Sequence, residues 1–150
     1  MISNLADYFE AEQEFYLDKV LYHRIDKKEQ AEEYSLNCID NIEVQVNEDK
    51  VRLTVKRVLK FKPEEIFELS VSYGAILKIK AEKRGDYDWE NINLAEEFRE
   101  NGQFVLGNLM NRISLLIAEI TSSFGQTPLI LPPQIASKKI SSNILETENQ

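Results

Sequence analysis

Three consecutive stretches in the middle of the chain alternate between apolar and polar residues, and this period of two constrains the fold more than any other feature. The stretches cover residues 42–46, 51–62 and 67–79. Such alternation is typical of strands that bury one face and leave the other in water. Turn sequences separate them at 47–50 and at 63–65, where a proline forbids strand continuation. Three strands joined by short turns predict an antiparallel meander.

A fourth strand is expected at residues 15–25, although the spacing there leaves a helix open. Three aromatic rings and a β-branched residue favour the strand. The residues that would share one face of this strand have odd numbers: Phe15, Leu17, Leu21, His23 and Ile25. Residues 26–38 form a polar crossing without a strong pattern. Within the last stretch, Gly74 indicates a bulge or a close approach to the backbone.

The second half of the chain is predicted to be helical. Asn93 lies three residues before Glu96, which resembles a capping box, and Asn101 with Gly102 supplies a helix stop. A long amphipathic helix then follows the i, i+3, i+4, i+7 rule through Leu106, Leu109, Met110, Ile113, Leu116, Ile117 and Ile120. Gly125 closes this helix, and the prolines that follow require the next segment to be extended.

Strands followed by helices predict an α+β fold, a four-stranded antiparallel sheet with helices packed on one face. The domain is expected to cover residues 15–135. Residues 1–14 would be an acidic N-terminal lead, a frayed helix or a disordered segment, and residues 136–150 a polar C-terminal tail.

The amino-acid composition is that of an ordinary globular protein, and the net charge disfavours nucleic acid as a partner. In 150 residues, 43% are hydrophobic and 29% charged, and 18 bases against 26 acids give a net charge of −8. This balance argues against binding nucleic acid by phosphate neutralisation.

A single cysteine, Cys38, excludes an intrachain disulfide. The acidic N-terminus is unlike a signal peptide and no apolar run suggests a membrane span, so we expect a cytoplasmic protein.

Motifs for catalysis or metal binding are weak. His23 is the only histidine, no nucleophile motif accompanies it, and a strand or surface histidine is favoured. Asp86 to Glu97 echo a calcium loop, but Asn91 stands where an EF-hand needs glycine. A solvated acidic loop is favoured, and no cofactor is expected.

Residues 50–62 hold six bases and no acid. Four of them would lie along one face of a strand: Arg52, Lys56, Lys60 and Lys62. The favoured interpretation is that these residues lie on the solvent-exposed face of a sheet whose other face is covered. The alternative is a surface that binds RNA or an acidic partner. The chain also has more aromatic residues than one sheet face against one helix can hide, which predicts a groove or an interface.

Two segments resemble the SecB family of export chaperones. Residues 66–79, IFELSVSYGAILKI, are similar to the family's fourth strand, and residues 111–133, NRISLLIAEITSSFGQTPLILPP, to its long helix and the extended segment after it. Residues 15–25 resemble its first strand more loosely. The resemblance implies a cytosolic dimer of dimers, without a cofactor, that holds unfolded polypeptide in apolar grooves. The groove positions would be Tyr73, Leu77, Phe104 and Leu109.

The resemblance also shows a departure at the positions where the family docks the basic tail of the translocase motor. Arg24 and Lys28 stand at the strand-one positions, and Glu68 and Ser70 at the strand-four positions. Two bases where acids are expected would repel a basic tail, which disfavours the translocase motor ATPase as a partner. We therefore expect a non-enzymatic chaperone or adaptor for non-native polypeptide, which serves either protein export or a dedicated client such as an antitoxin. The alternative is a small-molecule-binding or catalytic α+β domain with a sheet-helix pocket.

Overall fold

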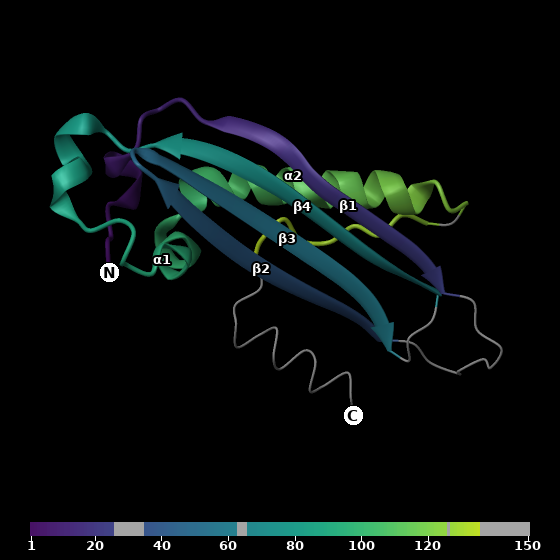
Figure 1. The fold of residues 1–150 in the computed structure, drawn as a ribbon. Coiled ribbons are helices and arrows are strands. Elements are labelled where there is room, and N and C mark those ends of the chain that lie inside the picture. Colours follow the sequence, from purple (N-terminus) through teal and green to yellow (C-terminus); the bar gives the residue numbers. More distant parts are fainter. Residues whose placement is uncertain (26–34, 63–65, 126, 136–150) are drawn as a thin grey trace.

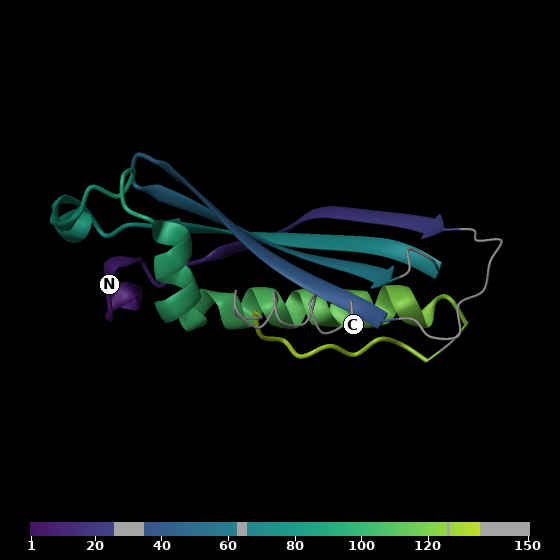
Figure 2. The same ribbon diagram turned by 90° about the horizontal axis from the view of Figure 1, so that it is seen from below.

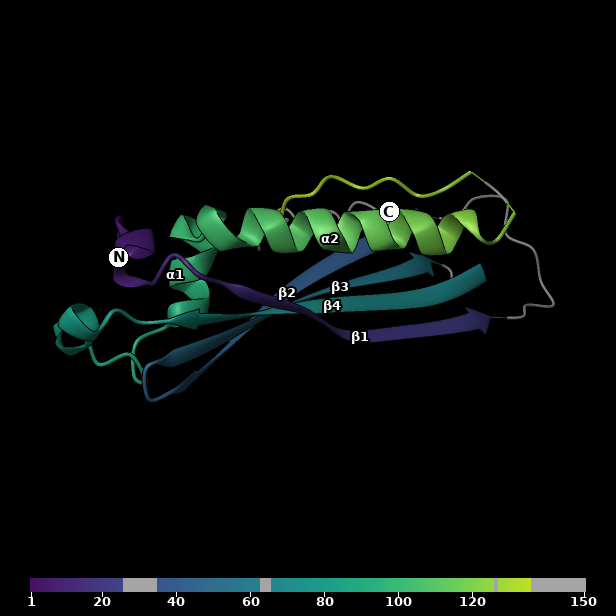
Figure 3. The same ribbon diagram turned by 90° about the horizontal axis from the view of Figure 1, so that it is seen from above.

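The computed structural model describes residues 1–25, 35–62, 66–125 and 127–135. Its centre is one antiparallel sheet in the strand order β1-β4-β3-β2 (Figure 1). The strands are β1 (Glu14–Ile25), β2 (Ser35–Asn47), β3 (Lys50–Lys62) and β4 (Ile66–Lys78). The α-helices α1 (Leu94–Asn101) and α2 (Gln103–Ser122) lie on one face of the sheet (Figures 2 and 3). The predicted four-stranded α+β fold is confirmed.

The side of the sheet covered by the helices is called the inner face, and the opposite side the outer face. On β3 the odd-numbered residues point inward, and Val51, Leu53 and Val55 are fully buried. The even-numbered Arg52 and Lys56 are exposed on the outer face, as the alternation predicts. Burying this apolar side under the helices stabilises the fold by about 25 cal/mol for each Å² removed from water.

The meander follows the predicted order, with tighter connections than expected. β2 and β3 are joined by the two residues Glu48 and Asp49, and Glu48 has a φ of 58°. β2 begins at Ser35, so the end of the predicted polar crossing is already strand. The rest of that crossing and the predicted turn at 63–65 lie outside the described residues.

β1 is a strand, as predicted, but its odd-numbered residues do not share one face. The register of β1 against β4 shifts at Asp18. Before the shift, Phe15 pairs with Ala75 and faces inward; after it, Leu21 pairs with Ser70 and faces outward. The prediction of a single face was wrong because one extra residue in a strand inverts the alternation beyond it.

Gly74 allows the close approach that its place in a strand indicates. It lies opposite Tyr16 on β1 and Thr54 on β3 without a register shift of its own. The ring of Tyr16 occupies the space where a Cβ atom at position 74 would stand. The bulge in this part of the sheet is therefore in β1, and glycine is required for the aromatic ring across it.

The two helices meet at Gly102. The Asn93 side chain accepts a hydrogen bond from the Glu96 N–H at 3.2 Å and caps α1, as predicted. The Gly102 N–H donates to the carbonyl of Phe98 at 2.8 Å, and α2 begins at the next residue. A Cβ atom on Gly102 would collide with that carbonyl, so the sharp turn between the helices needs glycine.

α2 is long and apolar enough to cross a membrane by length and composition alone. Its inward side, however, is buried against the sheet. Leu109, Ile113 and Ile117 are fully buried. This helix therefore serves as the cover of the inner face.

The N-terminal residues belong to the packed unit, which differs from the expected frayed or disordered lead. A short 3-10 helix, η1 (Leu5–Tyr8), buries Leu5 and Tyr8. Phe9 follows it into the core and stacks with Phe104 at 6.0 Å between ring centroids. A second 3-10 helix, η2 (Ala81–Asp86), precedes α1. Residues 136–150, the predicted tail, lie outside the described residues.

Candidate functional site

An extended segment after α2 forms the most distinctive feature of the inner face. Residues 127–135, called the strap, run back alongside α2 on the same side of the sheet (Figures 1 and 3). They contain neither helix nor strand, as the prolines predict. The strap therefore lies over the sheet beside the helix as a length of extended polypeptide.

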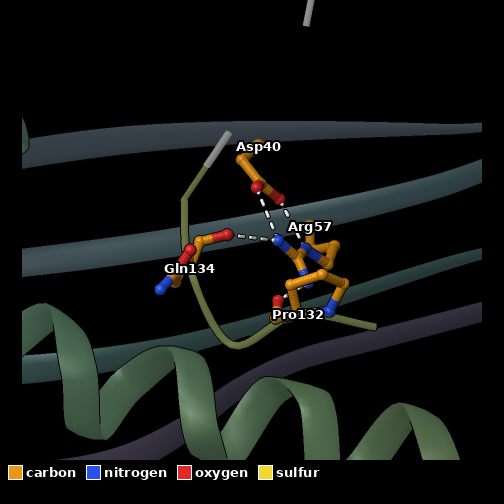
Figure 4. A network of polar contacts seen from close by, with 4 residues as sticks. All are labelled: Asp40, Arg57, Pro132 and Gln134. Carbon is orange, nitrogen blue, oxygen red and sulfur yellow. Dashed lines mark hydrogen bonds and ion pairs between the residues drawn. The ribbon is translucent and has the colours of Figure 1, made fainter. Parts of the chain in front are cut away.

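One buried arginine holds the strap to β3. Arg57 is only 2% exposed, and its Nε and Nη2 donate to the two carboxylate oxygens of Asp40 at 2.7 and 2.8 Å (Figure 4). Its Nη1 donates to the carbonyl of Pro132 at 2.9 Å, and Nη2 also donates to the carbonyl of Gln134 at 2.8 Å. The guanidinium thus joins two strands and the strap, and it contacts the strap only through backbone atoms.

The charge of Arg57 is stabilised where it is buried. Burial itself disfavours the charged guanidinium, but the hydrogen bonds and the Coulomb attraction of Asp40 outweigh that cost and raise the pKa of Arg57 above its ordinary value. Because this raised pKa lies above the accessible pH range, Arg57 stays charged throughout it. Its contribution to stability would be lost only as the pH rises through that value.

The strap is also held by a hydroxyl and by alternate side chains. The Leu129 N–H donates to Thr121 Oγ1 at 2.8 Å, and that hydroxyl donates to the carbonyl of Ile117 in α2. Leu129 and Leu131 pack against the core, whereas Ile130 between them is 79% exposed. This alternation is the pattern of an extended peptide lying on an apolar floor.

Beyond the strap, the inner side of β2 remains partly open. Val44 and Val46 are only half-buried, and a hollow of about 330 Å³ separates them from the segment that includes Trp89 and Ile92. β2 is also an edge strand, so one side of its backbone is not paired within the described sheet. Partly exposed apolar side chains next to a strand edge that is unpaired in the described sheet are suited to an extended polypeptide.

The predicted groove positions fall into two groups. Leu77 and Leu109 are fully buried in the core of the chain. Tyr73 and Phe104 are half-buried at the margin of that core. Contact between any of these residues and a polypeptide stays a prediction.

Of the predicted docking positions that the structure describes, Arg24 lies apart from Glu68 and Ser70. Arg24 pairs with Phe67 and lies on the inner side of β1, whereas Glu68 and Ser70 lie on the outer face. The β1 bulge causes this separation. Glu68 forms an ion pair with Lys60 at 3.6 Å. Lys28 lies outside the described residues.

The sequence interpretation missed the Asp40–Arg57 pair, although a signal for it was present. Arg57 was grouped with the basic run, yet it shares its parity with the buried Val55 and Leu59. Asp40 likewise shares its parity with inward-facing Ile42. A charge at an inward position of a strand requires a partner of opposite charge, and this rule would have identified both residues.

A metal centre is not found in the described part of the chain. Within residues 1–25, 35–62, 66–125 and 127–135, no group of three His, Cys, Asp or Glu side chains is placed to hold a metal ion. Asp86 ends η2, and Asp88 accepts a hydrogen bond from Asn91.

Strand order, helix placement and the extended strap together define a divergent SecB-like α+β fold. The SecB-like chaperone Rv1957 of Mycobacterium tuberculosis, solved in complex with a ChAD peptide from the Rv1956 HigA1 antitoxin, has this fold. It matches with a TM-score of 0.64 at 13% identity, covering 85% of this chain and 88% of that chain. A protein of unknown function from Streptococcus agalactiae gives a TM-score of 0.47 at 12% identity, over 83% of this chain and 98% of that chain. No family model and no curated protein sequence matches.

Proposed function

We propose that this chain is a non-enzymatic, SecB-like chaperone or adaptor that holds non-native polypeptide in an extended form on its inner face. The strap is the observation that carries the proposal. An apolar, extended segment is held there through its backbone, by Arg57 and Thr121, and through alternate side chains. Contacts to backbone atoms do not depend on sequence, which is the property that a binder of many polypeptides needs.

The open inner side of β2 is the proposed place for the client. Val44 and Val46 lie beside the 330 Å³ hollow, and the edge of β2, which pairs with no other strand of the described sheet, offers backbone hydrogen bonds to an added strand. Burial of apolar client side chains would supply most of the affinity, at about 25 cal/mol per Å². The neighbour solved with an antitoxin peptide supports a client of that kind.

Assembly as a homo-oligomer, a dimer of dimers, belongs to the same proposal, as does a cytoplasmic location. β1 is the other edge of the sheet, and its Leu17, Leu21 and Tyr22 are exposed. A long edge strand with exposed apolar residues is a site for pairing with another chain. Leu115 on α2 is also exposed, at a helix surface that a second copy would cover.

The test uses two adjacent residues on opposite faces of β2. Val44→Glu replaces an apolar side chain at the hollow by a charge, and we expect it to weaken binding of an unfolded client by about tenfold. Gln45→Glu adds the same charge on the outer side of the same strand and should leave binding unchanged. Light scattering of an aggregating client measures the effect, and circular dichroism checks that both variants are folded.

Two results would contradict the proposal. One is a wild-type protein that does not suppress client aggregation at a stoichiometric ratio. The other is a pair of folded variants that suppress it equally. A saturable rise in melting temperature with a metabolite would instead favour the alternative of a small-molecule-binding or catalytic domain.

A further inference from the structure

The outer face of the sheet is bare in the described part of the chain. Both helices and the strap lie on the inner side (Figures 2 and 3). A sheet face left in water is expected to carry polar side chains in alternation with buried ones. The outer face departs from this expectation in the half of the sheet that lies away from the β2–β3 hairpin.

A row of four residues, three of them aliphatic and one a serine, crosses all four strands in that half and is called the apolar row. Its residues are neighbours in the sheet register: Leu21 pairs with Ser70, Ser70 with Val58, and Val58 with Ile39. Leu21 is 52% exposed, and the small, buried Ser70 leaves a dip between the leucine and the valine. A hollow of about 410 Å³ lies over this dip, and its walls include Lys56 and Lys60.

Lysines flank the apolar row on both sides. On one side of the row, Ser72 on β4 pairs with both Lys19 and Lys56. On the other side, Glu68 on β4 pairs with both His23 and Lys60. The flanking lysines, the apolar row and Lys62 of β3 are together called the outer patch. Its members are Lys19, Lys56, Lys60, Lys62, Leu21, Ile39, Val58 and Ser70.

Among the residues that the structure describes, the acids that neighbour the outer patch are fewer than its lysines. Glu68 forms an ion pair with Lys60, and Asp18 accepts a hydrogen bond from the Ser72 hydroxyl at 2.9 Å. The patch with these two acids therefore keeps a positive charge. The whole chain has a formal net charge of −8, so this local sign is opposite to that of the molecule. Such a separation of charge selects and orients a partner.

We propose that the outer patch docks an acidic, extended segment of a partner protein. One apolar side chain of that segment lies over Ser70, between Leu21 and Val58, and carboxylates on either side of it face Lys56 and Lys60. The spacing fits a strand that runs along β3, because the residues two positions before and after the apolar residue point to the same face and reach Lys56 and Lys60, each two residues from Val58.

The chemistry of the patch favours such a peptide over nucleic acid. A binder of single-stranded nucleic acid presents aromatic rings on which bases stack. The apolar residues of the outer patch are aliphatic, and Tyr22 beside the hollow turns its ring toward Phe67 and Phe124.

The docking of this segment is independent of client holding on the inner face. The experiment measures fluorescence anisotropy of three labelled probes with the full chain: a short peptide rich in Glu and Leu, its Lys and Leu counterpart, and a poly-U RNA. We expect the acidic peptide to bind most tightly, and its affinity to fall as salt is added. The double variant Lys56→Glu, Lys60→Glu should weaken it by about tenfold or more.

Lys50→Glu is the matched control, because Lys50 is an exposed lysine at the far end of the same strand and on the same face. It should keep the wild-type affinity. Stronger binding of the basic peptide or of the RNA would overturn the proposal, as would equal affinities of the control and the double variant. Client holding measured on the same proteins separates the two proposals, since the double variant should keep it.

Discussion

The inner and outer faces of the same sheet each carry an ion pair, and the two pairs differ in burial and in what they join. Arg57 and Asp40 are almost completely buried on the inner face, and the arginine is also bonded to the strap. Lys60 and Glu68 lie on the outer face with side chains 44% and 42% exposed. The buried inner pair therefore stabilises the fold by joining two strands and the strap, whereas the exposed outer charges can contact a partner.

The largest expected effect is the loss of the inner carboxylate. Asp40→Ala would leave a buried guanidinium without its counter-charge, which costs about 3–5 kcal/mol of unfolding free energy. Glu68→Ala on the outer face is the matched control and should cost less than about 1 kcal/mol, because water screens the exposed pair. Urea denaturation of the two variants measures both. Equal losses would show that the two faces do not differ in the way that their burial indicates.

A smaller effect is expected from the strap itself. Leu131 packs against the core and the neighbouring Ile130 points into water, so the two form an adjacent pair with opposite environments. Leu131→Ser should lower the free energy of unfolding by about 1–2 kcal/mol, and Ile130→Ser should leave it nearly unchanged. Thermal denaturation followed by circular dichroism checks this. A larger effect at Ile130 would mean that the strap does not lie on the inner face as described.

The sheet and helices could be predicted because their signals are local. Period-two alternation identified β3 and β4, and the long amphipathic repeat identified α2. The Asn93 cap and the Gly102 stop follow from the chemistry of helix ends. The placement of the helices on one face follows from strands preceding helices along the chain, whereas local patterns do not specify that β1 lies beside β4.

The parts that could not be predicted depend on contacts between distant residues. No sequence signal marks the bulge at Asp18, and the face of every later residue of β1 depends on it. The pairing of Asp40 with Arg57 is set by the β2–β3 register, and the bonds to Pro132 and Gln134 join residues more than seventy positions apart. For the same reason, the sequence does not show that Arg24 and Glu68, two of the predicted docking residues, lie on opposite faces of the sheet.

Site-specific photo-crosslinking tests the central claim, that non-native polypeptide is held on the inner face, most directly. A photoreactive residue replaces Val44 on the inner side of β2 or Val58 on the outer side of β3, and each protein is illuminated with an unfolded client. Our account predicts efficient crosslinks from position 44 and few from position 58. Crosslinks mainly from position 58, or none from position 44 in a folded protein that suppresses aggregation, would contradict it.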